Sequence, residues 1–341
     1  MPRILIVAPS WVGDTVMAQP LFARLHERRQ PLTLDVLAPE RTAALLAHMP
    51  EVAEVLPHTF AHGDLKIRAR HRLAREIRAR GYDQAIVLPN SFKSALIPFL
   101  ARIPLRTGFV GEMRRGLVND ARTLDPRAYP LMVERYALLG EEAQTPLTRP
   151  LAPPRLRVDP QATLAILEQL GVSASQPAAA LCVGAEYGPA KRWPAGHFAK
   201  LAQALFRQGH AVWLVGSPKD AAVGAEIAQA TGQRAVNLCG RTGLEEAIGL
   251  LSHAAFVVTN DSGLMHVAAA LGKPLVALYG SSTPAFTPPL SPTARVLSLG
   301  LPCSPCFKRE CPLGHYGCLT GLSPERVLEA IPPELLGPHG T

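Results

Sequence analysis

Residues 255–280 read AFVVTNDSGLMHVAAALGKPLVALYG and contain two apolar runs separated by a segment of helical length. The runs 255–259 and 274–280 have the composition of buried strands, and the alanines between them suit a helix that packs closely on a sheet. This order of strand, helix and strand is typical of a parallel βαβ unit. Asp261 and Ser262 stand where the first strand ends, a place where open α/β sheets bind ligands.

The same alternation runs through most of the chain. The segment 145–160 interrupts it, because TPLTRPLAPPRLRVDP is proline-rich and has no apolar period. The fold class predicted is α/β, with two Rossmann-like parallel-sheet domains facing a central cleft. Further strands are predicted at 3–8, 32–38, 84–89, 179–184, 211–216 and 235–239, and a helix at about 15–29.

The predicted domains are 1–150 and 151–322, followed by a C-terminal segment at 323–341. Within that segment, a helix is expected to start with Ser323 as its N-cap and Pro324 at its first position. This segment could pack back toward the N-terminal domain.

Composition narrows the classes of partner. The net charge of +8 favours acidic partners, but aromatic residues make up only 6% and do not alternate with basic ones, which disfavours nucleic acid. No apolar run approaches the roughly 18 residues of a membrane span, and the N-terminal apolar run is too short for a signal peptide. We therefore expect a cytoplasmic protein with at most peripheral membrane contact.

The segment 66–80, KIRARHRLAREIRAR, predicts a basic amphipathic helix. Ile67, Leu73 and Ile77 share one side of it, and arginines cover much of the rest. Such a helix suits an anionic membrane surface, although a solvated helix face explains the pattern equally well.

Gly13 and Asp14 lie in the first predicted turn between strand and helix. Asp14 could act as a general base or simply cap the helix. Neither a dinucleotide-binding glycine fingerprint nor a P-loop follows this strand, which disfavours an NAD-dependent oxidoreductase.

A second polar group follows the strand at 84–89. Asn90, Ser91, Lys93 and Arg114, with Arg106 and Arg115 nearby, could hold a phosphorylated acceptor. A capped helix with solvated charges is the alternative reading.

The second half of the chain has its own ligand candidates. Lys191 and Arg192 follow a strand and two glycines, a combination that favours phosphate binding over packing. Ser262 and Gly263 open a helix whose free N–H groups attract anions. Asp261 would repel phosphate, so it is expected to accept hydrogen bonds from sugar hydroxyls.

Four of the six cysteines, Cys303, Cys306, Cys311 and Cys318, fall in a short proline-containing segment with His315 between them. This spacing predicts a structural zinc site, an iron–sulfur cluster being less expected. Reduced thiols without a metal are the alternative.

Together, six motifs resemble the heptosyltransferases of inner-core lipopolysaccharide synthesis, which are GT-B enzymes of glycosyltransferase family 9. The resemblance is greatest to their type II members and spans residues 5 to about 292. The motifs are PSWVGD (9–14), LPNSFKSALIPF (88–99), RTGFVGEMR (106–114), GAEYGPAKRWP (184–194), TNDSGLMHVAAAL (259–271) and ALYGSSTPAFTPPLS (277–291).

The resemblance implies an ADP-heptose donor held by the C-terminal domain and a heptosyl-Kdo-lipid A acceptor held by the N-terminal domain. It implies inversion at the anomeric carbon without a catalytic metal cofactor. Asp14 matches the family's proposed base, and Gly13 lies beside it. The donor residues implied are Lys191, Asp261, Ser262, Gly263, Leu264 and His266, with Arg192 added from its position.

Several alternatives are also compatible with the sequence. They are a type I-like activity, another GT-B nucleotide-sugar enzyme such as an epimerase, and a non-enzymatic lipopolysaccharide-binding protein. The last would explain the basic runs but not the combination of Asp14, Lys191 and Asp261.

Overall fold

The computed structural model describes residues 1–60 and 63–337 of the chain. It divides into two compact units, unit 1 at Met1–Pro154 and unit 2 from Arg155 onward. The division falls inside the proline-rich segment 145–160, four residues later than the expected junction at 150/151.

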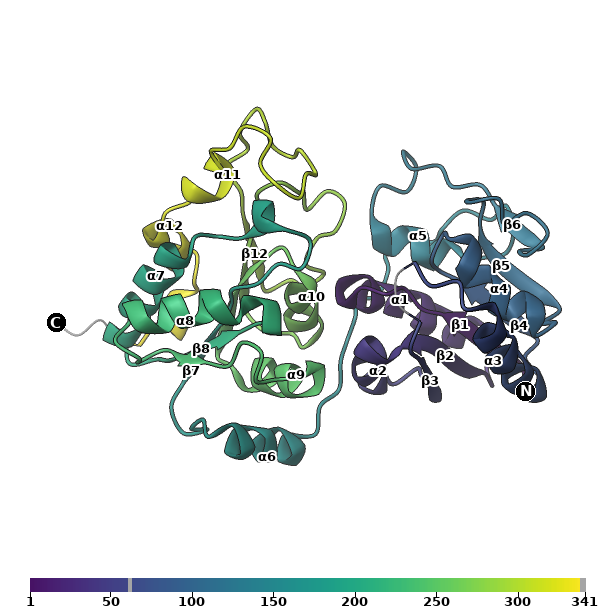
Figure 1. Cartoon of the computed structure of the whole chain (residues 1–341), viewed down its shortest axis with the longest axis horizontal. Helices are drawn as coiled ribbons and strands as arrows, with labels where there is room; N and C mark the ends of the chain where they lie inside the picture. Colours follow the sequence, from purple (N-terminus) through teal and green to yellow (C-terminus); the bar gives the residue numbers. More distant parts are fainter. Residues whose placement is uncertain (61–62, 338–341) are drawn as a thin grey trace. The chain divides into compact units, whose positions relative to one another are not determined.

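Unit 1 is built on a six-stranded sheet in the order β3-β2-β1-β4-β5-β6, with every pairing parallel (Figure 1). In the centre, Val7 of β1 pairs with Leu37 of β2 and Val87 of β4. The strands are β1 (Arg3–Val7), β2 (Thr33–Pro39), β3 (Glu54–His58), β4 (Gln84–Val87), β5 (Leu105–Phe109) and β6 (Asp120–Arg122).

Helices cover this sheet and bury its apolar strands. One core cluster joins Leu5 and Val87 of the sheet to Ile77 of α3 and Ile97 of α4. The helices of unit 1 are α1 (Val12–Arg28), α2 (Glu40–Ala47), α3 (Ile67–Ala79), α4 (Phe92–Leu100) and α5 (Met132–Leu138).

Unit 2 repeats the plan with a six-stranded parallel sheet in the order β12-β11-β10-β7-β8-β9. Its strands are β7 (Ala178–Cys182), β8 (Ala211–Val215), β9 (Val236–Asn237), β10 (Phe256–Asn260), β11 (Leu275–Leu278) and β12 (Ala294–Leu297). Its helices are α6 (Pro160–Leu170), α7 (Ala195–Arg207), α8 (Ala221–Ala230), α9 (Leu244–His253), α10 (Gly263–Ala270), α11 (Gly317–Thr320) and α12 (Pro324–Glu329).

Numbered within its own unit, each sheet has the strand order 3-2-1-4-5-6, the Rossmann order. The order reverses between β1 and β4 in unit 1 and between β7 and β10 in unit 2. Loops leave the carboxyl ends of these neighbouring strands in opposite directions, which opens a crevice at the switch point. The fold therefore marks one ligand-binding position in each unit.

Several predicted elements need adjustment. The helix expected from about residue 15 begins at Val12, and the strand expected at 235–239 is only Val236–Asn237. The sequence reading missed β3, β5, β6 and β12, because exposed or charged residues interrupt their apolar pattern.

The C-terminal helix α12 belongs to unit 2. Ser323 caps it by accepting a hydrogen bond from the Arg326 N–H at 3.3 Å, as the sequence predicted. Val327 is fully buried in the unit 2 core, where α12 packs against α7. The helix therefore completes this domain and does not form a separate segment.

Helix α3 buries Ile77 and packs Leu73 against the core as expected, but its first turn differs from the prediction. Arg70 is only 6% exposed, whereas Ile67 is 59% exposed. The Arg70 guanidinium donates to the backbone oxygens of Asp64, Leu65 and Lys93, and it lies 4.3 Å from the Phe60 ring centroid. Arg70 therefore fixes the loop before α3 and does not contribute to the basic surface.

No helix in the described part of the chain is long and apolar enough to cross a membrane.

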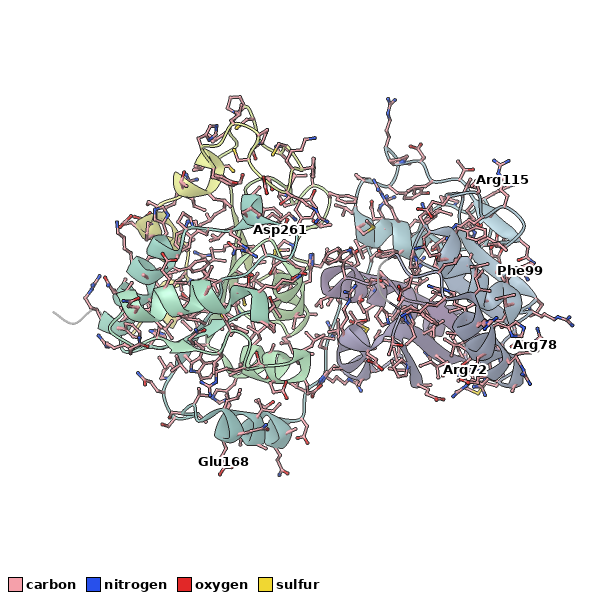
Figure 2. The ribbon with its side chains drawn as sticks, in the orientation of Figure 1. Arg72, Arg78, Phe99, Arg115, Glu168 and Asp261 are labelled. Carbon is pink, nitrogen blue, oxygen red and sulfur yellow. The ribbon has the colours of Figure 1, made fainter. Side chains whose placement is uncertain are left out.

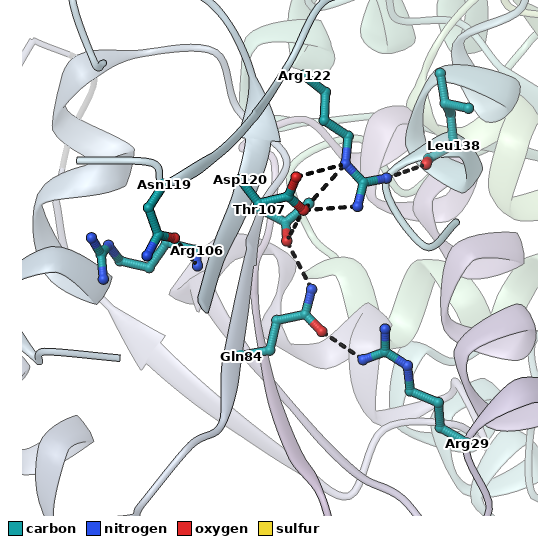
Figure 3. Close-up of polar contacts among 8 residues, drawn as sticks. All are labelled: Arg29, Gln84, Arg106, Thr107, Asn119, Asp120, Arg122 and Leu138. Carbon is teal, nitrogen blue, oxygen red and sulfur yellow. Dashed lines mark hydrogen bonds and ion pairs between the residues drawn. The ribbon is translucent and has the colours of Figure 1, made fainter. Parts of the chain in front are cut away.

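A polar network ties β4, β5 and β6 to the helices of unit 1 (Figure 3). Thr107 is fully buried and stands at its centre, accepting from Gln84 Nε2 and donating to Asp120, both at 2.8 Å. Gln84 in turn accepts from Arg29, the C-cap residue of α1, at 2.6 Å. Arg122 pairs with Asp120 and donates to the Leu138 carbonyl. Hydrogen bonds and an ion pair therefore connect these strands and helices at this side of the sheet.

We predict that Thr107→Val lowers the free energy of unfolding by about 1–3 kcal/mol, because it leaves Gln84 and Asp120 without their shared buried partner. Urea denaturation followed by circular dichroism measures this loss. Thr107→Ser keeps the hydroxyl and removes one methyl group, so it should cost no more than about 1 kcal/mol. Equal losses for the two variants would mean that the hydroxyl network contributes nothing.

Candidate functional site

The switch point of unit 1 places Asp14 in the first turn of α1. The N-cap of this helix is Trp11, whose side chain makes no capping bond, so Asp14 is the third helical residue and not the cap. Asp14 is half-buried at the carboxyl end of β1. The helix-cap reading of Asp14 was therefore wrong, while a role as base stays a prediction.

A tyrosine from α5 lies near Asp14. Helix α5 packs against α1, and Tyr136 is 7% exposed. Burial raises the pKa of Tyr136 well above its usual value, and the negative charge of Asp14 raises it further. Tyr136 therefore stays a neutral hydroxyl within electrostatic range of Asp14, and nothing in the sequence indicated this neighbour.

The acceptor candidates after β4 have different roles in the structure. Arg114 is 1% exposed, and its guanidinium donates to the Phe109 carbonyl at 2.9 Å and to Asn90 Oδ1 at 2.7 Å. It therefore positions Asn90 instead of presenting an exposed charge, which corrects the expectation for Arg114. Ser91 accepts from the Ser94 N–H at 3.3 Å and is the N-cap of α4.

Asn90 itself is exposed, and Lys93 is half-buried in the first turn of α4. Gly111 lies close against Asn90, since a Cβ at residue 111 would stand 2.9 Å from the Asn90 carbonyl oxygen. Gly13 is buried in the first turn of α1, after the strand that pairs with β4. These residues surround the same switch point as Asp14.

A basic side chain that the sequence reading did not consider also lies at this edge of the sheet. Arg41 follows β2, and its Nε donates to the Ser10 carbonyl at 3.0 Å. Its guanidinium carbon lies 5.9 Å from the centroid of the Trp11 ring, which is 47% exposed. The sequence indicated Arg41 only by its position, because it is the second residue after the end of β2.

In unit 2 the switch point holds an ion pair between Asp261 and Lys191. Lys191 Nζ lies 2.5 Å from Asp261 Oδ2, and the Ser282 hydroxyl donates to the same oxygen. Asp261 is only 5% exposed, and Lys191 lies at the end of a 3-10 turn at Pro189–Lys191. The carboxylate therefore fixes the lysine at the end of β10.

Asn260 holds the loop that carries Lys191, and the sequence reading missed it. Asn260 is fully buried, accepts from the Trp193 N–H at 3.0 Å and donates to the Val183 carbonyl at 3.0 Å. Trp193 Nε1 donates to the Leu322 carbonyl at 2.8 Å. The sequence indicated this residue only by placing an amide directly after an apolar strand.

Helix α10 begins at this point without a side-chain cap. Its N-cap Ser262 makes no capping bond, and Gly263 and Leu264 are its first two residues. Free N–H groups and the positive end of the helix favour an anion here. Burial lowers the pKa of His266 to about 4 against the opposing charge of Asp261, so this imidazole is neutral.

Arg192 contacts the next loop. Its Nη2 lies 3.4 Å from Asp220 Oδ1, and the same carboxylate accepts from Ser217 Oγ at 2.7 Å. A side chain at Gly184 would collide with the Asp220 carboxylate, so glycine is required for this close packing. Asp220 is 5% exposed and holds Arg192 next to Lys191.

The four clustered cysteines are free and half-buried. Cys303, Cys306 and Cys311 lie in the loop between β12 and α11, and Cys318 lies in α11. This loop also contacts the Lys191 loop through a hydrogen bond from the Ala190 N–H to the Arg309 carbonyl at 3.0 Å. Within the described ranges, no three His, Cys, Asp or Glu side chains already stand in metal-binding geometry.

Comparison with known proteins agrees with this geometry. Residues 70–317 match the profile of glycosyltransferase family 9 (heptosyltransferase). The chain is 48% identical to lipopolysaccharide heptosyltransferase 2 of Salmonella typhimurium, covering 96% of this chain and 97% of the relative. It is 44% identical to lipooligosaccharide heptosyltransferase 2 of Haemophilus influenzae, covering 96% and 98%.

Solved structures agree at the level of the fold. The structure of E. coli ADP-heptose lps heptosyltransferase II superposes with a TM-score of 0.87 at 44% identity, covering 98% of each chain. A glycosyltransferase family 9 structure from Veillonella parvula gives 0.84 at 22% identity, which shows the shared fold. With its two Rossmann-type units of matching strand order, the chain therefore belongs to glycosyltransferase family 9, the heptosyltransferases, and is a glycosyltransferase of the GT-B fold.

Proposed function

We propose that the enzyme transfers heptose from ADP-L-glycero-D-manno-heptose to heptosyl-Kdo-lipid A during lipopolysaccharide core biosynthesis. The type II heptosyltransferase names of its relatives support this choice of acceptor over a type I-like one. A non-enzymatic lipopolysaccharide-binding protein and an NAD-dependent oxidoreductase are disfavoured by membership of a glycosyltransferase family.

The observation that carries the proposal is the complementary chemistry of the two switch points. Unit 1 offers the carboxylate of Asp14, which can accept a proton from an acceptor hydroxyl. Unit 2 offers Lys191 and the uncapped start of α10, which can hold a diphosphate. A glycosyl transfer needs both a base and a stabilised anionic leaving group.

In the proposed reaction, an acceptor hydroxyl attacks the anomeric carbon of heptose in line with the bond to ADP. The new C–O bond forms as the bond to the diphosphate oxygen breaks, and Asp14 takes the hydroxyl proton. Its position in the first turn of α1 favours the ionised form and weakens it as a base. We therefore expect the new C–O bond to be largely formed before the proton reaches Asp14. The transition state resembles an oxocarbenium ion.

The electron pair of the broken bond leaves with ADP. Lys191, Arg192 and the N–H groups of Gly263 and Leu264 would stabilise the added negative charge from fixed positions. We propose that these groups serve in place of a catalytic divalent metal. Asp261 would keep Lys191 in place and accept a hydrogen bond from the sugar, while neutral His266 lines the same helix.

The acceptor is proposed to bind at the unit 1 switch point. Asn90 and Lys93 stand there with Arg41, which suits an anionic sugar core. Ser91 and Arg114 would support the pocket by fixing α4 and Asn90.

We also propose that unit 1 contacts the cytoplasmic face of the inner membrane, where a lipid A acceptor is anchored. Helices α3 and α4 pack together and expose basic residues next to Phe99, which is 41% exposed. Arg72, Arg78, Phe99 and Arg115 lie along one side of unit 1 (Figure 2). Arginines beside an exposed aromatic ring are typical of peripheral contact with anionic lipids.

Asp14→Asn should lower turnover by at least about 100-fold, because the amide cannot accept the hydroxyl proton. Its affinity for ADP should be unchanged, since Asp14 lies in the other unit from Lys191. Steady-state transfer assays and calorimetry measure the two quantities. Glu40→Gln, which changes an acid in the first turn of α2, is the matched control and should keep normal turnover. Near-normal transfer by Asp14→Asn would remove the base assignment.

Lys191→Ala should weaken ADP binding by about 10- to 100-fold, because it removes a charge-assisted contact and leaves Asp261 unpaired beside the phosphates. Calorimetric titration of ADP, with UDP and NAD as competing nucleotides, measures the loss and the preference for ADP. Lys200→Ala removes an exposed lysine on α7 of the same unit and should leave ADP affinity unchanged. Equal affinities for all three nucleotides would contradict an ADP-sugar donor.

Reversing charge with Arg72→Glu and Arg75→Glu together should reduce binding to anionic vesicles by at least about 30-fold, at roughly 1 kcal/mol per basic residue. Sedimentation with phosphatidylglycerol-containing vesicles measures this, and phosphatidylcholine vesicles should bind neither form. Arg207→Glu with Arg326→Glu reverses two exposed charges in unit 2 and serves as the control. Equal vesicle binding by the two double variants would contradict docking through α3.

A further inference from the structure

The loop that carries three of the four clustered cysteines is long and irregular. Residues 298–316, here called the cysteine loop, connect β12 to α11 without any helix or strand. Two of its apolar side chains, Phe307 and Leu313, are 50% and 61% exposed, and Leu299 packs against the unit 2 core. A loop of this length with so little apolar burial needs another source of order.

The four cysteines, three in this loop and Cys318 just after it, line one cavity. Cys303, Cys306, Cys311 and Cys318 surround it together with Ser281 and Ala190. The cavity has a volume of about 20 Å³ and can hold one water-sized group. Four cysteine sulfurs around a space of this size are the ligand set of a four-cysteine metal site.

Details of the loop support thiolate chemistry at this cavity. The Tyr316 N–H donates to Cys311 Sγ at 3.4 Å, the kind of backbone contact that a metal-bound thiolate accepts. All four cysteines are free, so no disulfide competes for them. His315 Nδ1 accepts from the Gly317 N–H at 2.7 Å, so only its Nε2 could compete with the four sulfurs as a ligand.

We propose that Cys303, Cys306, Cys311 and Cys318 bind one thiolate-preferring divalent metal ion, zinc in the first place. Each ligating thiol releases its proton to solvent, and the sulfur atoms close to about 2.3 Å from zinc. In the described chain the sulfurs line the cavity without forming this coordination shell, so the exposed cysteine loop must contract around the ion.

The ion would also order the donor site, an effect that rests on the proposed function. The Phe307 N–H donates to the Ser281 carbonyl at 2.7 Å, and the Ala190 N–H donates to the Arg309 carbonyl at 3.0 Å. Ser281 precedes Ser282 and Ala190 precedes Lys191, which are the two partners of Asp261.

The positions of two further side chains strengthen this coupling. The Tyr187 hydroxyl donates to the Phe307 carbonyl at 2.7 Å, and Lys191 Nζ lies 5.1 Å from the Tyr187 ring centroid. Gly188 has a φ of +155°, and a Cβ there would stand 2.5 Å from the Arg309 carbonyl oxygen. The Lys191 loop and the cysteine loop are thus packed backbone to backbone.

Metal analysis of the full chain tests the site independently of activity. Untagged protein, purified under reducing conditions, incubated with excess Zn²⁺ and desalted, should retain about one ion per chain by plasma mass spectrometry. Cys311→Ser should lose the ion, whereas Cys311→His keeps a nitrogen ligand and should retain it. Cys182→Ala with Cys239→Ala removes the two cysteines outside the cluster and should leave the metal content unchanged.

A wild-type content below about 0.1 ion per chain after this incubation would overturn the site, because four thiolates should hold zinc through desalting. Full metal content in Cys311→Ser, with unchanged circular dichroism, would overturn the assignment to these cysteines. Iron in place of zinc after expression without added metal would support the same four-thiolate site.

The coupling has a separate readout. Removing the metal by chelation should raise the KM for the sugar donor by about tenfold while changing kcat less, because an ordered cysteine loop keeps Lys191 in position for donor binding. An unchanged donor KM in metal-free protein would contradict the coupling and leave the metal site standing. A metal-loaded chain that binds no ADP would instead contradict the proposed function.

Discussion

Strand order is the constraint on which the rest of this structure depends. Both sheets run 3-2-1-4-5-6 within their own units, so the connections diverge after β1 and β4 and after β7 and β10. The divergence places Asp14 and Asn90 at one switch point, and Lys191 and Asp261 at the other. Residues from distant parts of the chain are thereby brought to two positions that follow from the order of strand pairing.

At the second switch point, buried polar contacts convert this placement into a rigid site. Asn260 joins the ends of β10 and β7 and holds the backbone at Trp193, while Asp261 holds the side chain of Lys191. Removing either partner would leave the other charge buried and unpaired, so this ion pair keeps the lysine at the end of β10 before any ligand binds. Preorganised charge of this kind stabilises a leaving group without reorganisation during the reaction.

The sequence predicted the fold class and most central strands, because continuous apolar runs such as 3–8 and 255–259 mark buried parallel strands. It could not predict the edge strand β6, whose residues Asp-Ala-Arg are polar, or the burial of Arg70 and Arg114. Those two arginines are buried because they donate to backbone carbonyls that are distant in the sequence. Only the folded chain brings these carbonyls close to them. Asn260 was missed for the same reason, whereas Asp14, Lys191 and Asp261 were predicted from motif resemblance and strand position.

The central claim is heptose transfer from an ADP-linked donor to an acceptor that already carries one heptose. The most direct measurement incubates the purified chain with ADP-L-glycero-D-manno-heptose and either heptosyl-Kdo-lipid A or the same acceptor without heptose, and follows the acceptor mass. We predict the addition of one heptose to the first acceptor, with ADP released in equal amount, and none to the second. Transfer only to the heptose-free acceptor, or ADP release without any change in acceptor mass, would contradict it.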